Sequence, residues 1–284
     1  MASAAEWDGA AGSYHSFARF TEQFARHAVA TALGPLSTRT GTEEQPLMLL
    51  DVASGTGVAA FGLIDALPAN AWATVLATDF AEAMLGQLRA KASQRAEDDA
   101  AKHPHVTLQA ERMDAQDMPS VRDATMDAAT MVFGLHNLPN PVSGAREFYR
   151  VLRPGAKGVI VTWHWNKLRE FIAQMRLEVG DVEAKAADYI GPMTNEGEMR
   201  RCLHEAGIPD ACIVVDMVKG LPMQMSLEEL VVYLRTNSLV PALREVDASL
   251  VRRVVSEDRG FGAWGDDSGF ILWGTAMEVS VTKP

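Results

Sequence analysis

The sequence is poor in cysteine and lacks any long apolar run, and each absence excludes a class of protein. Cys202 and Cys212 are its two cysteines, too few for a disulfide framework or, by themselves, for a zinc site, so a reduced intracellular protein is expected. No apolar run approaches the roughly 18 residues of a membrane-spanning helix. The first residues carry Glu6 and Asp8 in place of the apolar core of a secretory signal or the arginines of a transit peptide. We therefore expect a cytoplasmic protein without stable membrane insertion.

Clusters of basic residues are also missing. The formal net charge is −11 at pH 7, and no stretch is rich in Lys and Arg. A nucleic acid or an anionic membrane surface is therefore not an expected partner. With 284 residues, 48% of them hydrophobic, the chain suits one large domain or one domain with a substantial insertion. The sequence leaves the oligomeric state open.

Short apolar runs alternate with helical patterns between residues 47 and 163. Most of these runs lack polar alternation, which is typical of parallel strands buried on both faces. Asn140 followed by Pro141 predicts the start of a helix, and Pro154 with Gly155 predicts a stop. The alternation predicts a doubly wound α/β fold. The runs are Leu47–Val52, Ala73–Thr78, Val106–Ala110, Met126–Val132 and Gly158–Trp163.

The pattern changes after Trp163. Helices are expected over about 166–189 and 195–206, and the capping box Ser226-Leu-Glu-Glu229 opens another. A strand is expected at Ile213–Val218. Residues 277–282 alternate strictly between apolar and polar, which indicates a half-exposed strand at an antiparallel edge.

Together these patterns predict a mostly parallel seven-stranded sheet with an antiparallel C-terminal strand and helical lid insertions. The insertions, about 166–190 and 221–270, are expected to close over a substrate pocket. We divide the chain into an N-terminal helical cap (1–46), a cofactor-binding α/β core (47–163) and a remainder with helical substrate-side insertions (164–284).

The densest chemical signal is the turn after the first run, in Leu49-Leu-Asp-Val-Ala-Ser-Gly-Thr-Gly57. Gly55 and Gly57 allow the backbone to approach a ligand, and the free N–H groups of the next helix point to the same place. One suitable ligand is the pyrophosphate of a dinucleotide, because Gly55-x-Gly57-x-x-Ala60 loosely fits that fingerprint. The other is the amino-acid end of S-adenosylmethionine. Asp51 would repel a pyrophosphate but can orient the turn or attract an ammonium through water. A tight turn without a ligand is the third possibility.

Polar residues follow the next three strands and should lie at the same edge of the sheet. Asp79 is placed to accept both hydroxyls of a ribose, or to cap the following helix. Asp114 could accept a hydrogen bond from the exocyclic amine of an adenine, or be a surface acid. His136, with Asn137, is placed to face a methyl acceptor as a general base, or to pack the loop.

In their order along the chain, these segments resemble the class I S-adenosylmethionine-dependent methyltransferases, and among them the ubiquinone/menaquinone-biosynthesis C-methyltransferases. The resemblance covers roughly 47–163 and implies a Rossmann-like fold, an S-adenosyl-L-methionine cofactor and an enzyme. The segments are LDVASGTG, TDFAEAML, MDAQDMP, MDAATMVFGLHNLP and EFYRVLRPGAKGVIVTW.

Some residue roles carry over from that family. The Thr between the glycines, the acid after the second strand, the Asp-Ala pair after the third and the residue ending the fourth contact the cofactor there. They correspond to Thr56, Asp79, Asp114 with Ala115, and Val132. The quinone enzymes usually place a Ser where Val132 stands, and Trp163-His164-Trp165 replaces their usual ending of the fifth strand.

The sequence thus predicts a cofactor site with an acceptor site beside it. Tyr14 lies where many proteins of this fold close a helix over the cofactor, and His164 joins His136 as a candidate base. No metal ligands are predicted. The predicted acceptor-contacting residues are Tyr14, His136, Trp163 and Trp165. The predicted cofactor-binding residues are Asp51, Ala53, Ser54, Gly55, Thr56, Gly57, Asp79, Phe80, Met84, Asp114, Ala115, Val132 and Phe133.

The expected function is transfer of a methyl group from S-adenosylmethionine to a small, apolar-bodied acceptor by in-line displacement. Bulky apolar residues late in the chain would suit a flat or lipid-like acceptor. One alternative is an NAD(P)-dependent oxidoreductase, which would use the same turn and Asp79 but does not explain Asp51 or Asp114. Another is a non-catalytic S-adenosylmethionine-binding protein. The late apolar residues are Met223, Met225, Phe261, Trp264, Phe270 and Trp273.

Overall fold

The centre of the computed structural model, which describes residues 4–181, 193–237, 240–257, 265–266 and 269–284, is a seven-stranded sheet. Its strand order is β3-β2-β1-β4-β5-β10-β6, and β10 runs antiparallel to both of its neighbours while the other strands share one direction. The predicted mostly parallel sheet with an antiparallel C-terminal strand is confirmed. The strands are β1 (Leu47–Val52), β2 (Ala73–Asp79), β3 (Val106–Arg112), β4 (Met126–Val132), β5 (Leu152–Asn166), β6 (Ile213–Lys219) and β10 (Gly274–Thr282).

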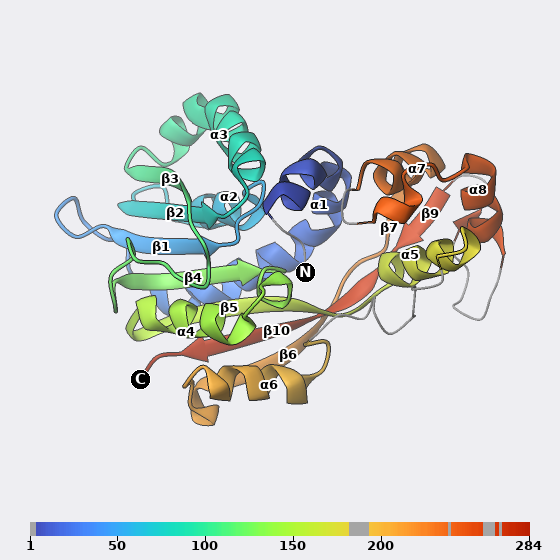
Figure 1. The fold of residues 1–284 in the computed structure, drawn as a ribbon. Coiled ribbons are helices and arrows are strands. Elements are labelled where there is room, and N and C mark those ends of the chain that lie inside the picture. The colour runs from blue at the N-terminus through green and yellow to red at the C-terminus, as the bar shows by residue number, and fades with distance from the viewer. Residues whose placement is uncertain (1–3, 182–192, 238–239, 258–264, 267–268) are drawn as a thin grey trace.

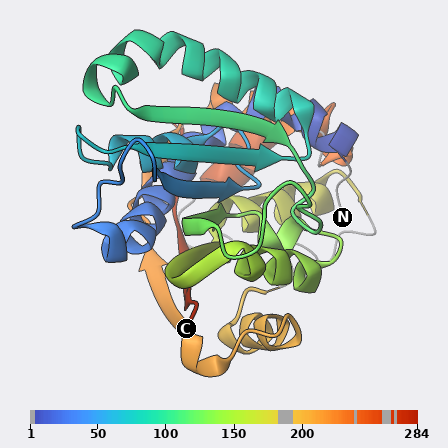
Figure 2. The same cartoon turned by 90° about the vertical axis from the view of Figure 1, so that its left-hand side faces the viewer.

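Helices cover both faces of the sheet, as a doubly wound fold requires. Helices α1, α2 and α3 bury their apolar sides in the core on one face, and α4 and α6 belong to a second core on the other. Figure 2 shows the teal helix α3 on one side of the strands and the green helix α4 on the other. These helices are α1 (Ala4–Leu33), α2 (Val58–Asp65), α3 (Glu82–Lys102), α4 (Pro141–Val151) and α6 (Glu196–Glu205).

Helix caps read from the sequence form as expected. The Asn140 side chain accepts a hydrogen bond from the Ser143 N–H at 3.0 Å, with Pro141 at the first helical position. Ser226 and Glu229 make a reciprocal capping box at the start of α7 (Leu227–Thr236). These local bonds need no tertiary contact, which explains why sequence alone places the helix starts.

The prediction of an exposed edge strand at the C-terminus is wrong. β10 lies between β5 and β6, and Glu278 at its centre is only 3% exposed. Its carboxylate lies 2.6 Å from His27 Nδ1 and accepts a 2.7 Å hydrogen bond from the Thr31 hydroxyl, both on α1. A polar residue can be buried when it has such partners, so the alternating pattern here reflects a polar helix contact and not solvent.

The late insertions gather beyond the carboxyl ends of the parallel strands (Figure 1). β5 runs directly into α5 (Lys167–Glu178), and α8 (Ala248–Ser256) follows α7. The insertions are not entirely helical, because they include a small antiparallel sheet in the order β7-β9-β8. Residues 182–189 of the helix expected over 166–189 lie outside the described residues. The strands of the small sheet are β7 (Met223–Met225), β8 (Gly265–Asp266) and β9 (Gly269–Leu272).

Along the described residues, no helix has both the length and the apolar character needed to cross a membrane. The three-part division of the chain stays a prediction, and β5 continues through its boundary at residue 163.

Candidate functional site

A pocket opens where β1, β2, β3 and β4 end, and most of the predicted cofactor residues meet there. Consecutive parallel strands bring their carboxyl ends to one edge, so turns far apart in the sequence share one cavity. The lining residues are Trp7, Ala53, Gly55, Asp79, Phe80, Met84, Met113, Asp114, Ala115, Gln116, Val132, Phe133, Gly134, Asn137, Leu138 and Pro139.

Two non-glycine residues at the pocket adopt left-handed backbone conformations. Ala53 (φ 53°) directly follows β1, and Phe133 (φ 57°) directly follows the neighbouring β4. Such conformations cost free energy outside glycine and tend to occur at functional sites. Gly55 (φ 53°) has open space where a Cβ would stand, which leaves room for a ligand against the backbone.

Gly57 serves packing and not the pocket. A Cβ there would lie 2.8 Å from both Leu88 Cγ and Phe61 Cε2, and its φ of 88° also favours glycine. The glycine lets α2 start close to α3. Thr56 lines a separate groove between α1, α2 and α3. The two glycines of the motif therefore have different roles: Gly55 lines the pocket, and Gly57 allows close packing of the helices.

The Asp79 carboxylate is held in place by backbone. One oxygen accepts the Gly55 N–H at 2.8 Å and the other accepts the Ala81 N–H at 2.9 Å. Burial raises the pKa of Asp79, while these N–H groups act against that rise. Asp79 lines the pocket, and a carboxylate oxygen can accept more than one hydrogen bond, which suits a diol with two hydroxyl donors. Helix-capping and ribose-binding geometries are thus compatible in one side chain.

Asp51 and Ser54 leave buried oxygen atoms without partners behind the turn. Asp51 is 1% exposed; its Oδ1 accepts a hydrogen bond from the Thr130 hydroxyl at 2.9 Å, and Oδ2 has no partner. Burial raises the pKa of Asp51 to about 7. Ser54 Oγ is also buried and unpartnered. Buried oxygens of this kind need a hydrogen-bond donor, and the ammonium of an amino-acid group can supply it, directly or through water.

The loop after β3 carries the predicted adenine contacts. The Gln116 backbone N–H donates to Asp114 Oδ1 at 2.9 Å, and the Gln116 side-chain amide also binds that carboxylate. The same Gln116 side chain accepts the Asn140 N–H at 2.7 Å, which links the loop to the start of α4. Asp114 lines the pocket beside the buried Ala115.

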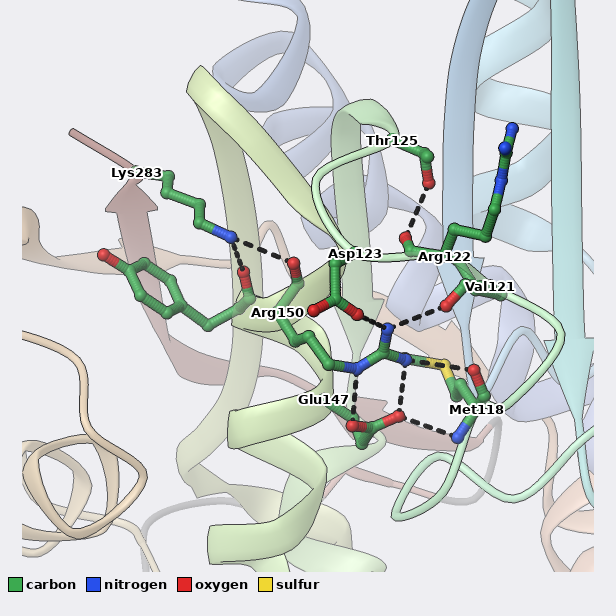
Figure 3. Close-up of polar contacts among 9 residues, drawn as sticks. Met118, Val121, Arg122, Asp123, Thr125, Glu147, Arg150 and Lys283 are labelled. Atoms are coloured by element: carbon green, nitrogen blue, oxygen red, sulfur yellow. Dashed lines mark hydrogen bonds and ion pairs between the residues drawn. The ribbon is translucent and has the colours of Figure 1, made fainter.

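A guanidinium on α4 fixes the rest of this loop (Figure 3). Arg150 donates to the carbonyls of Val121 and Met118 at 2.8 and 3.0 Å and forms ion pairs with Glu147 and Asp123. Glu147 in turn accepts the Met118 N–H at 2.8 Å. Many charge-assisted bonds to one segment hold it in a single geometry. The loop that presents Asp114 is therefore preformed.

His136 lies just behind the pocket wall. It is 6% exposed on the short helix η2 (Leu135–Asn137), and its Nδ1 has no hydrogen-bond partner. Burial, followed by the charge of Arg169, lowers the pKa of His136 to about 3. The imidazole is therefore neutral and a weak base as it stands. Its role as a general base stays a prediction.

The other predicted acceptor residues lie at varied positions. Trp163 is 3% exposed and stacks on Phe133, with ring centroids 4.1 Å apart, so it forms the inner support of the pocket wall. Trp165 packs on Trp273, with ring centroids 4.4 Å apart. His164 is exposed, and its Nδ1 lies 2.7 Å from the Thr194 carbonyl. None of the three lines the described pocket. Tyr14 lies in α1, and its side chain is outside the described part of the chain.

Several lining residues were not predicted from the sequence. Trp7 arrives from the N-terminal helix, and Gln116, Gly134, Leu138 and Pro139 belong to loops whose path depends on tertiary contacts. Gly134 could have been predicted, because it lies two residues after the end of β4 at Val132, where the ligand-binding turns of this fold are expected. A Cβ on Gly134 would lie 2.7 Å from Ala53 Cβ, so glycine lets the two strained turns touch.

Comparison with curated proteins gives partial matches. The chain is 36% identical over 107 residues to a demethylmenaquinone methyltransferase of Protochlamydia amoebophila, which is 38% of this chain and 40% of that protein. It is 35% identical over 132 residues to the ubiquinone/menaquinone biosynthesis C-methyltransferase UbiE of Methylobacterium nodulans, which is 46% of each. The matches thus span less than half the length of these relatives.

Solved structures share the fold over most of the chain. The YcgJ protein of Bacillus subtilis aligns with a TM-score of 0.55 at 14% identity, covering 91% of this chain and 99% of that one. The [4+2]-cyclase SpnF aligns with a TM-score of 0.51 at 16% identity, covering 92% and 80%. These similarities establish the fold. They do not identify the reaction, which has to be inferred from the residues of the site.

A family profile identifies the sequence more directly. The profile of the ubiE/COQ5 methyltransferase family matches residues 34–176, a span that contains β1 to β5 and the turns that line the pocket. The resemblance and the S-adenosylmethionine cofactor expected from the motifs are confirmed at the level of the family. The chain belongs to the ubiE/COQ5 methyltransferase family.

Proposed function

We propose that this chain transfers the methyl group of S-adenosylmethionine to a small acceptor with an apolar body. The observation that carries the proposal is the convergence of Asp79, Asp114 and the Gly55 turn on one pocket at the carboxyl ends of adjacent strands. When bound, the cofactor supplies an electrophilic methyl group on a sulfonium. The protein then has to bind the cofactor and the acceptor, align them and exclude water. For some acceptors it also has to accept a proton.

Each end of the cofactor has a matching group in the pocket. The fixed Asp79 carboxylate accepts the ribose hydroxyls, and Asp114 with Ala115 meets the adenine at the rim. The buried, unpartnered oxygens of Asp51 and Ser54 lie behind the Gly55 turn, outside the residues that line the pocket, and we assign them to the amino-acid end of the cofactor, directly or through water. An anionic pyrophosphate would face two buried carboxylates here, which argues against a dinucleotide.

We propose that the acceptor site is built around His136 and Arg169, which are not among the residues that line the cofactor pocket. Arg169 lies in the first turn of α5, where its backbone N–H donates to the Asn166 side chain at 2.9 Å. Burial lowers the pKa of Arg169 to about 10, and Tyr233 on α7 contributes an opposing effect. A cation in such surroundings favours an acceptor that develops negative charge on oxygen, such as a phenol or an enol. We propose that binding this oxygen at Arg169 offsets the charge that depresses the basicity of His136.

The curated relatives are named for demethylmenaquinone and for ubiquinone/menaquinone biosynthesis. A quinol would fit the proposed chemistry, since it combines an ionisable hydroxyl with an apolar body. Because the curated matches cover under half of those relatives, and the family profile ends at residue 176, a quinol is one candidate among phenols and enols.

Calorimetric titration and a methyl-transfer screen test the proposal. S-adenosylmethionine and S-adenosylhomocysteine should bind with measurable heat and NAD(P)H should not. Labelled cofactor should then deliver methyl to a quinol, phenol or enol in preference to amines, tRNA or histone peptides. Binding of NAD(P)H alone would favour the oxidoreductase alternative. Cofactor binding without transfer to any acceptor would favour the non-catalytic one, and activity confined to tRNA or peptide would remove the small-molecule proposal.

A further inference from the structure

The first turns of α1 reach the cofactor pocket from outside the region that the family profile matches. Trp7 lines the pocket together with Asp79, Phe80 and Met84. It also packs in a small apolar cluster around Ala81 and Met84 that is separate from the two large cores. This end of α1 is therefore attached at the pocket rim, whereas the later residues Phe20 and Phe24 are fully buried in the main core.

Asp8 supplies a bond that α3 cannot make for itself. The N-cap position of α3 is Ala81, which has no side chain able to cap the helix. The Asp8 carboxylate accepts the Ala83 N–H at 2.8 Å instead, across 75 positions of sequence. A negative charge at a helix N-terminus is favourable, so this contact holds the start of α1 to the start of α3.

Both contacts are made to the segment that directly follows the residue proposed to bind the ribose. The chain passes from Asp79 through Phe80 and Ala81 into α3, so the segment that Asp8 and Trp7 hold is continuous with the ribose ligand. The charge of Asp8 is also one of the smaller causes of the raised pKa of Asp79.

We propose that the first turns of α1 complete the cofactor site, with Trp7 contacting the bound cofactor at its ribose–adenine end and Asp8 acting as the positioning residue that holds this helix over the pocket. An aromatic ring suits this end because it can cover a flat base and exclude water. The inference rests on the proposed function, since it assumes that S-adenosylmethionine is the ligand.

Calorimetry with S-adenosylhomocysteine on matched variants of the full chain tests the proposal. Trp7→Ala should weaken binding about tenfold, in line with the loss of one aromatic–base contact, and Trp7→Phe should recover most of it. Asp8→Ala should weaken binding about fivefold, and Asp8→Asn should restore it, because an amide oxygen also caps a helix. The controls are Trp72→Ala, a tryptophan stacked on His105 at the far end of β2, and Asp98→Asn, an exposed acid on α3.

Tryptophan fluorescence gives a readout that does not depend on stability. Saturation with S-adenosylhomocysteine should change the emission of the parent chain more than that of Trp7→Phe. Equal spectral changes in the two proteins, or unchanged affinity in Trp7→Ala, would overturn the role of Trp7. Equal affinities of Asp8→Ala and the parent would overturn the role of Asp8. If the parent itself fails to bind the ligand, the proposed function fails instead, so the two failures are distinguishable.

Discussion

The cofactor side and the acceptor side of this protein are built in different ways. The cofactor side uses consecutive strand–turn units, in which the functional residues lie at or just beyond the end of a strand: Asp79 ends β2, Ala53 follows β1 and Phe133 follows β4. The proposed acceptor side combines η2, α5 and α7, which carry His136, Arg169 and Tyr233. The cofactor side is a local strand–turn unit repeated along the chain. The proposed acceptor side forms only when segments distant in the sequence pack together.

The electrostatics of the two sides differ as well. Asp79 is buried but held by two backbone N–H groups, and Asp51 is buried with one oxygen held and one not. Burial, followed by the charge of Arg169, lowers the pKa of His136. The cofactor side thus presents carboxylates that can accept hydrogen bonds, whereas the side proposed for the methyl acceptor presents a cation and a neutral imidazole. Variants in each side should affect different measurements.

The largest expected effect concerns Gly57, where the cofactor turn joins the core. Gly57→Ala should lower the free energy of unfolding by about 3 kcal/mol, because the new methyl group would overlap Leu88 and Phe61 in a left-handed conformation. Gly55→Ala, with open space at the same kind of φ, should cost only about 1 kcal/mol. Urea denaturation measures both. Equal losses would mean that the two glycines do not have separate tasks.

The next effect tests the Asp79 carboxylate, the group proposed to accept hydrogen bonds from the ribose. Asp79→Ala should weaken S-adenosylmethionine binding about 100-fold, because two hydroxyls lose a charged partner. Asp114→Ala, at the exposed rim, should weaken it only about fivefold, since water can replace the lost bond. Calorimetry gives both affinities, and circular dichroism checks the fold. Unchanged affinity in Asp79→Ala would remove Asp79 from the site.

The pH dependence of cofactor binding should report on Asp51. Because burial raises the pKa of Asp51 to about 7, lowering the pH from about 8 to about 6 should protonate it and weaken cofactor binding by up to about tenfold. The folded state also binds this proton more tightly than the unfolded state. The ligand-free protein therefore loses stability from Asp51 as the pH rises from about 4 through about 7.

Asp51→Asn serves as the control for that dependence. It should bind the cofactor more weakly at pH values above about 7, and its binding should lose the change between pH 6 and 8 attributed to Asp51. Its free energy of unfolding at about pH 8 should equal or exceed that of the parent, because the cost of burying a carboxylate is gone. A parent titration that is flat across this range would contradict the assignment.

The smallest expected effect concerns the acceptor side. Arg169→Met should leave cofactor affinity within about twofold of the parent, as should the exposed control Arg201→Met. In NMR titration, the pKa of His136 should rise but stay below its usual value, because burial is the larger cause and the Arg169 charge the smaller. A large loss of cofactor affinity in Arg169→Met would show that the two sides are not separate.

Local sequence patterns predicted much of the fold. The apolar runs 47–52 and 126–132 coincide with β1 and β4, and the caps at Asn140 and Ser226 coincide with helix starts. The exception at the C-terminus is instructive, because Glu278 finds its partners on α1, more than two hundred residues earlier. A pattern based on the periodicity of one strand cannot show which distant helix will cover it.

The sequence by itself determined the order of the strands along the chain and the residues that end them, and hence the pocket formed by Asp79, Asp114 and the Gly55 turn. Those features follow from local periodicity, turn chemistry and the rule that parallel strands bring their carboxyl ends to one edge. Only the tertiary structure decided that Trp7 and Asp8 reach this pocket, that Gly57 packs while Gly55 lines it, and that His136 is buried near Arg169. Those outcomes depend on which helices cover which face and how deeply each side chain is removed from water, and no local pattern encodes either.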